Sequence, residues 1–156
     1  MSMKKSIVLF FLIAVAPFSS SKKNQDYVMY HKFENHIWKR FNILQFEIPV
    51  KAQKESYDIS FFAHITRDYE YDFLDFNMIM TTPSGEERIK EYHIDIKTRN
   101  GTFLERFTND SSEFSVPLKK GLTLTSGKLT VQIENLVPRL ETKAVQGVGI
   151  RLHPVR

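Results

Sequence analysis

The sequence predicts an all-β protein: an antiparallel, two-sheet, jelly-roll-like β-sandwich of about eight strands after an N-terminal signal segment. Three observations lead to this prediction. Apolar and polar residues alternate over many short stretches, as on strands with one buried face. Turn residues separate these stretches at intervals of about 8 to 12 residues. No stretch keeps a 3.6-residue apolar period, so helices are not expected. A lipocalin-like barrel is the alternative that the same pattern allows.

The clearest strands lie between Ser56 and Met80. The first predicted strand alternates strictly, with apolar side chains at Tyr57, Ile59, Phe61, Ala63 and Ile65. An acidic, tyrosine-rich turn follows over residues 67–72, and the alternation resumes at Phe76, Met78 and Met80. These two paired strands are expected to be the centre of the fold.

The other elements are predicted in chain order around this pair. Before it come a short extended piece at 27–30, a packing segment at 33–38, and a strand at 44–50 whose Pro49 indicates a sheet edge or a strand end. After it, Pro83-Ser84-Gly85 and Asn100-Gly101 predict chain reversals. Further strands are expected at 89–96, 114–118, 129–134 and 145–152, while 103–107 is either a short strand or a helical turn.

The N-terminal segment has the layout of a secretory signal. Lys4 and Lys5 precede an apolar run of roughly 11 residues, followed by small residues. Cleavage is expected after Ala14-Val15-Ala16 or among Ser19 to Ser21; an uncleaved N-terminal helix is the alternative. We therefore predict a signal peptide at 1–21, a tether at 22–32 and the sandwich domain at 33–156. The protein is then exported, to the periplasm or the outer membrane, and is membrane-associated only if its leader anchors it.

Composition limits the function classes. The 156 residues are enough for one domain, and 42% hydrophobic residues with 13 phenylalanines can fill its core. No cysteine is present, which excludes disulfides, thiolate metal sites and cysteine nucleophiles. The net charge is +4, and without the two leader lysines 20 basic residues face 18 acidic ones, leaving +2. This near balance does not indicate a nucleic-acid partner.

No catalytic residue, metal site or cofactor is predicted. The histidines are scattered and lack metal-ligand spacing: His31, His36, His64, His93 and His153. Four acidic residues cluster in the turn region and allow a calcium loop or a glycosidase pair, but no glycine bends the loop, so a solvated connection is preferred: Asp68, Glu70, Asp72 and Asp75. The nucleophile motif GxSxG is absent from the sequence, and SxxK does not occur within the predicted sandwich domain.

An aromatic platform is the best binding candidate in the sequence. Tyr69 and Tyr71 in the charged turn, together with Trp38, are the residues expected to stack on sugar rings or on a partner's side chains. The alternative is that the aromatic residues, Trp38 included, fill the core. Arg67 and Arg139 are expected to form structural ion pairs with Asp58, Asp75 or Glu134.

The order of these features resembles the GldH family of gliding-motility lipoproteins from Bacteroidetes, from about Tyr30 to Leu152. Several residues and segments carry the resemblance: Trp38, Tyr57-Asp58-Ile59, Arg67 with Tyr69-x-Tyr71, Phe73-Leu74-Asp75-Phe76, Pro83-Ser84-Gly85, Gly127 to Glu134, Pro138-Arg139 and Gly147 to Leu152. The resemblance implies a non-enzymatic envelope protein linked to gliding and to the type IX secretion machinery. It carries no catalytic residues over, and the lipidated cysteine of that family is missing here.

Three functions follow as hypotheses. The first is an envelope component that docks onto other proteins of the motility or secretion machinery. The second is a carbohydrate-binding module that uses the aromatic platform to hold a glycan. The third, a glycosidase or metal hydrolase, requires carboxylates or ligands that converge in a cleft.

Overall fold

The computed structural model describes residues 25–51 and 55–155. The predicted signal peptide, residues 1–21, lies outside these residues, as does the start of the predicted tether. Within the described ranges, no helix has the length and apolar character that crossing a membrane requires.

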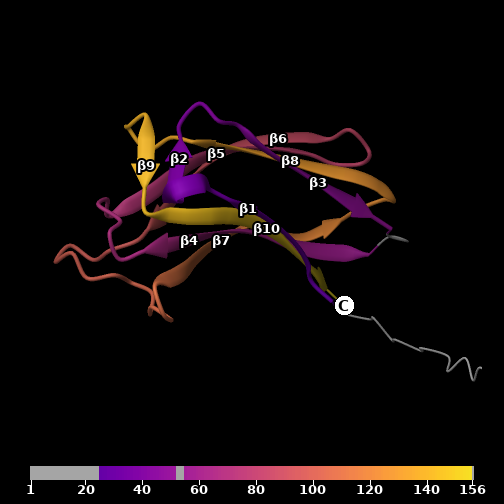
Figure 1. Ribbon diagram of the computed structural model, residues 1–156. Coiled ribbons are helices and arrows are strands. Elements are labelled where there is room, and N and C mark those ends of the chain that lie inside the picture. The colour runs from indigo at the N-terminus through magenta and orange to yellow at the C-terminus, as the bar shows by residue number, and fades with distance from the viewer. Residues whose placement is uncertain (1–24, 52–54, 156) are drawn as a thin grey trace, which may run out of the picture.

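Two four-stranded antiparallel sheets form the body of the protein. The first, called the β4 sheet, has the strand order β1 (Tyr27–Lys32), β10 (Val145–Val155), β4 (Ser56–Thr66) and β7 (Ser111–Thr123). The second, called the β5 sheet, has the order β3 (Leu44–Val50), β8 (Gly127–Asn135), β5 (Phe73–Thr81) and β6 (Glu87–Asp95). A small sheet of β2 (Ile37–Lys39) and β9 (Glu141–Lys143) lies at one end, beside the single-turn 3-10 helix η1 (Glu34–His36). Figure 1 shows the two large sheets as stacked layers, with β2 and β9 at the left end.

The strand order is that of a jelly roll. Each sheet combines strands from the beginning, middle and end of the chain, and neighbouring strands within a sheet pair antiparallel. The prediction of a jelly-roll-like sandwich is therefore confirmed. The strands form two separate four-stranded sheets, so the alternative of a lipocalin-like barrel does not apply. Pro49 lies on β3, an edge strand, where its missing N–H leaves no gap in a central ladder.

The core lies between the two sheets and follows the predicted alternation. The side chains of Ile59, Phe61 and Ile65 on β4 are fully buried, and so are those of Phe76 and Met80 on β5. The rings of Phe61 and Phe76 stack across the interface, with centroids 4.1 Å apart. Burying side chains of this size stabilises the fold by roughly 1.5–3 kcal/mol each.

Two predicted boundaries differ from the structure. Residues 27–32 of the predicted tether form β1, which pairs with β10 from Tyr27–Leu152 to Lys32–Gly147. Most side chains of β1 are exposed, so without apolar alternation the sequence indicated only a short extended piece at 27–30. Residues 103–107 form neither a strand nor a helical turn; Phe103 makes one isolated bridge with Lys97. The turn at Pro83-Ser84-Gly85 forms as predicted, with Gly85 at φ +89° and its N–H bonded to the carbonyl of Thr82.

Candidate functional site

The predicted aromatic platform does not form, because Trp38 and Tyr69 are buried. Trp38 has 0% exposure and stacks between Phe33 and Phe61, where β2 covers the end of the core. Tyr69 is 1% exposed, its hydroxyl donates a 2.8 Å hydrogen bond to the carbonyl of Phe73, and burial raises its pKa. Tyr71 is half-buried and packs edge-on against Tyr69. Only Tyr71 of the three predicted residues reaches the surface.

The predicted ion pairs of Arg67 and Arg139 are also wrong. Among the described residues, neither guanidinium pairs with a carboxylate within 4.0 Å. The Arg67 guanidinium instead lies 4.4 Å from the ring centroid of Phe107. Arg139 is exposed. Of the predicted acidic partners, Asp58 Oδ1 accepts the N–H of Gly121 and Asp75 Oδ1 binds His93 Nδ1.

The predicted acidic cluster does not converge on a cleft. Asp68, Glu70 and Asp72 are exposed, whereas Asp75 lies on β5 and binds His93 Nδ1 at 2.5 Å. His93 Nε2 also lies 3.1 Å from Asp95. Partial burial lowers the pKa of His93, but the two carboxylates outweigh it and raise that pKa above its ordinary value. In the described part of the chain, no three His, Asp or Glu side chains gather as metal ligands would.

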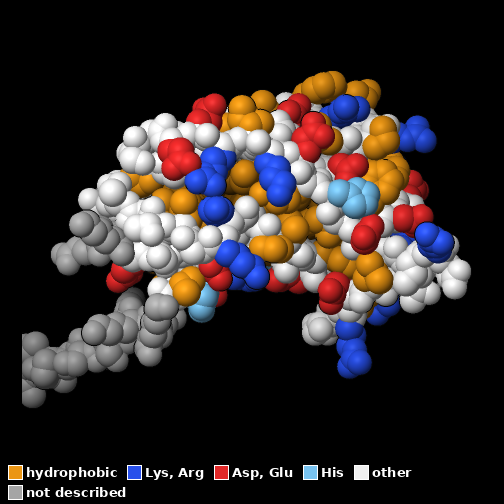
Figure 2. Space-filling model, turned by 180° about the vertical axis from the view of Figure 1, so that it is seen from behind, with side chains coloured by type: hydrophobic (Ala, Val, Ile, Leu, Met, Phe, Trp, Pro, Cys, Tyr) orange, Lys and Arg blue, Asp and Glu red, His pale blue; other side chains and the backbone are white. Residues whose placement is uncertain are grey.

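Exposed apolar side chains gather instead at the end of the sandwich that carries β2 and β9. Phe41 is 75% exposed, Ile43 58% and Leu140 69%. The two loops that bear them adjoin, since the N–H of Arg40 donates a 2.9 Å hydrogen bond to the carbonyl of Leu140. We call these three residues the apolar rim. Figure 2, in which this end lies on the right, shows hydrophobic and basic side chains side by side along its border.

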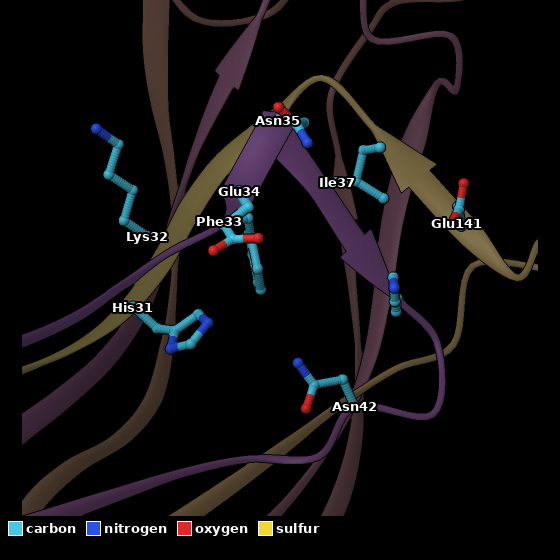
Figure 3. A pocket seen from close by; sticks show the side chains of 9 residues that line it. His31, Lys32, Phe33, Glu34, Asn35, Ile37, Asn42 and Glu141 are labelled. Atoms are coloured by element: carbon cyan, nitrogen blue, oxygen red, sulfur yellow. The ribbon is translucent and has the colours of Figure 1, made fainter.

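Two hollows flank β9 beside the apolar rim. The first has a volume of about 560 Å³ and lies between β1, η1 and β2. In Figure 3, His31, Glu34 and Asn42 surround its open space, and Glu141 stands on β9 across from them. The second, of about 230 Å³, is lined by Glu70, Tyr71, Arg139, Glu141 and Lys143. Glu141 lines both hollows, so they belong to one continuous surface.

This end is built on a strained but well-supported backbone. Asn35, His36 and Ala144 have φ values of 51°, 55° and 65°, in the left-handed region that such residues seldom adopt. Strain of this kind persists only where the surroundings enforce it, and it concentrates at functional sites. Here the pairing of β2 with β9 and the hydrogen bond from Phe33 N–H to the carbonyl of Gln146 hold the chain in place.

Asn135 fixes β9 and β2 onto the sandwich from within. Its side chain is fully buried; its amide donates to Thr142 Oγ1 at 2.8 Å and to the carbonyl of Trp38 at 3.3 Å. Its carbonyl oxygen accepts the N–H of Val137 at 2.9 Å. A buried amide whose nitrogen and oxygen both have hydrogen-bond partners rigidifies the elements that it joins. The apolar rim and the hollows therefore lie on a preformed surface.

Exposed apolar side chains beside two hollows form an arrangement suited to binding. Sequence reasoning missed Ile43 and Leu140. The signal was present: Phe41 and Leu140 are isolated apolar residues beside Arg40 and Arg139, and Ile43 lies outside the alternating positions that begin at Leu44. An apolar residue without alternating neighbours has no predicted buried face, so exposure is the expectation.

Comparison with known proteins gives one family. A family model described as GldH lipoprotein matches residues 25–152. No curated protein matches the chain. Among solved structures, the crystal structure of dimeric latent PorU from Porphyromonas gingivalis is similar at a TM-score of 0.37 and 7% sequence identity, over 84% of this chain and 13% of the PorU chain. The chain thus spans a small part of PorU, and a likeness of this strength supports no conclusion about fold or function.

Proposed function

The chain belongs to the GldH lipoprotein family, and from this premise we propose that it is a non-enzymatic component of the cell envelope that binds other envelope proteins. Its partners belong to the gliding-motility and type IX secretion machinery, as the family resemblance implies. The protein resides in the periplasm or at the outer membrane. The sequence holds no cysteine, so membrane association in this proposal runs through the N-terminal leader.

The exposure of the apolar rim is the observation that carries this proposal. Binding energy at protein interfaces concentrates in a few large side chains that become fully buried. Phe41, Ile43 and Leu140 are large, exposed and grouped at one end of the molecule. Each contributes roughly 1.5–3 kcal/mol when it is removed from water. The two hollows beside the rim can accept side chains of the partner.

Charge around the rim defines the partner's chemistry. Four basic residues lie at or beside the rim: Lys39, Arg40, Arg139 and Lys143. They outnumber the acidic residues that line the two hollows, which are Glu34, Glu70 and Glu141. We therefore infer a protein partner that presents an apolar pocket bordered by Asp or Glu side chains. Complementary charge of this kind raises the association rate and makes it sensitive to salt.

The location of the rim fits a partner held away from the leader. β1 begins beside the C-terminal end of β10, at the opposite end of the molecule from β2 and β9 (Figure 1). A chain tethered through residues that precede β1 would thus present the apolar rim on its far side.

Photo-crosslinking in living cells tests the proposal. A photoreactive phenylalanine analogue is placed at Phe41, at Leu140 or, as a matched control, at Ile89, which is 64% exposed on the edge strand β6. We expect Phe41 and Leu140 to crosslink to the same envelope protein of the motility or secretion machinery, and Ile89 not to do so. Crosslinks that are absent at the rim, or equally strong at Ile89, would show that the rim is not a docking surface.

A purified pair then measures the contribution of the rim. Phe41→Ser with Leu140→Ser should weaken binding to the crosslinked partner by at least about a hundredfold, as expected for the loss of two buried anchors. Ile89→Ser should leave the affinity unchanged. Arg40→Glu should slow association and reduce its salt dependence.

A further inference from the structure

A second aromatic cluster lies on the outer face of the β4 sheet, away from the core. Phe62 follows the core residue Phe61 on β4 and points outward, yet its side chain is only 3% exposed. The ring of Tyr30 lies parallel to it, at 5.9 Å between centroids and 5° between planes. The Arg151 guanidinium lies 4.6 Å from the Phe62 centroid. Tyr30 itself is 41% exposed and forms the surface of the cluster.

Two glycines of β10 create the space for these rings. A Cβ atom at Gly149 would lie 2.4 Å from the Phe62 ring and 2.5 Å from the carbonyl oxygen of Met29. A Cβ atom at Gly147 would lie 2.3 Å from the Tyr30 hydroxyl. Any other residue would push the rings off the sheet. Glycine within a strand marks such a close approach.

Charged groups are fixed beside the exposed ring. Arg151 donates two hydrogen bonds to Glu113, at 3.0 and 3.2 Å, and His64 Nε2 lies 3.3 Å from the same carboxylate. Burial raises the pKa of Glu113, but Arg151 and His64 outweigh it and keep that pKa below its ordinary value. Glu113 is thus an ionised, oriented acceptor, and the ring of His64 lies 5.3 Å from that of Tyr30.

A polar groove continues from His64 and Glu113 along the outer face. Its volume is about 330 Å³, and its other walls carry Arg106, Glu105, Thr108 and Ser111. This volume lies at the small end of the range for small-molecule sites. The groove therefore offers hydroxyls, carboxylates and a guanidinium. His64, one of its lining residues, lies next to the exposed ring of Tyr30.

We propose that this face binds a saccharide, with the ring of Tyr30 against the C–H face of a sugar and the groove holding its hydroxyls. A sugar hydroxyl both donates and accepts hydrogen bonds, so it can pair with Glu113 and with Arg106 alike. The carboxylates of Glu105 and Glu113 disfavour a phosphate or sulfate in the same place. The polar walls disfavour a wholly apolar ligand, because it would bury their polar groups without giving them hydrogen bonds. This proposal is independent of the docking role of the apolar rim.

Nuclear magnetic resonance titration of the full chain tests the proposal. The probes are methyl glycosides of glucose, galactose and mannose, N-acetylglucosamine and its dimer, and xylobiose, each up to about 10 mM because single-site sugar contacts are weak. At least one should shift the amide signals of Tyr30, His64 and Ser111 to Glu113. Inorganic phosphate should not. A result in which no saccharide shifts these signals, or phosphate shifts them more strongly, overturns the proposal.

Variants distinguish binding from folding. Glu113→Gln keeps the shape of the side chain and should weaken saccharide binding by about tenfold or more. Tyr30→Ala should do the same, whereas Tyr30→Phe, which keeps the ring, should bind within about twofold of the wild type. Tyr71→Ala and Ile89→Ala are controls that should leave the affinity unchanged. Equal affinity of Tyr30→Ala, Glu113→Gln and wild type, with all three folded, would place the saccharide elsewhere and refute the site.

Discussion

Replacement of Gly149 by alanine tests the close packing of β1, β10 and β4. On its own, adding a methyl group to a strand glycine stabilises a protein by about 0.4–1 kcal/mol, because the unfolded chain loses freedom. Here the new Cβ would meet the Phe62 ring at 2.4 Å and the Met29 carbonyl oxygen at 2.5 Å. One of these neighbours is backbone and cannot rotate away. We therefore expect destabilisation by roughly 2–3 kcal/mol, at the upper end of overpacking effects.

Thermal and urea unfolding of Gly149→Ala measure this effect. The expected loss corresponds to a decrease in Tm of about 6–12 °C for a domain of this size. In a Phe62→Ala background, Gly149→Ala should still destabilise, but less, because the contact with Met29 remains after the ring is removed. A Tm equal to or above that of the wild type would refute the close approach of the three strands. Saccharide binding should fall together with stability as β1 and Tyr30 shift.

Three further predictions concern the core, the β2–β9 end and pH. Phe61→Ala should cost about 3–5 kcal/mol in urea unfolding, since the ring is fully buried and stacked on Phe76; a cost near zero would contradict the described core. Asn135→Ala should cost about 1–3 kcal/mol, because Thr142 and the N–H of Val137 lose their buried partner, and hydrogen exchange should accelerate selectively in β9. The pKa of His93 is raised in the folded state, so its stabilising contribution is complete below the unfolded value of about 6.5 and is lost as pH rises through the folded value. The Tm difference between wild type and His93→Gln should therefore be larger at about pH 5.5 than at about pH 8.5, and an opposite trend would contradict the pairing with Asp75 and Asp95.

Much of the fold was predictable because alternation and turn chemistry are local. A period of two specifies which side chains of a strand share a face, and so the inward positions Ile59, Phe61 and Ile65 could be read from the residues alone. Asn100-Gly101 likewise requires a reversal, and Gly101 has φ +77°. The weakly patterned β1 was expected only as a short extended piece at 27–30, since its place in a sheet depends on a long-range ladder with β10.

The binding surfaces were much less predictable. Trp38 and Tyr69 lie where no apolar period distinguishes a buried ring from an exposed one. In the structure, Trp38 on β2 is buried against Phe33 and Phe61, and Tyr69 is buried with its hydroxyl bonded to the carbonyl of Phe73. Phe62 lies next to Phe61 on β4, so its side chain points to the outer face of the sheet. It is nevertheless covered, because β10 brings Gly149 beneath it and β1 brings Tyr30 over it.

The sequence by itself determined most of the strands, their inward faces, the main turns and the absence of cysteine chemistry. Only the tertiary structure decided which aromatic residues reach the surface and which charged groups meet. The physical reason is that the burial of a side chain outside the alternating pattern depends on residues far away in the chain. Tyr30, Phe62, Glu113 and Arg151 come from four different strands, and no local propensity records that the jelly roll brings them together.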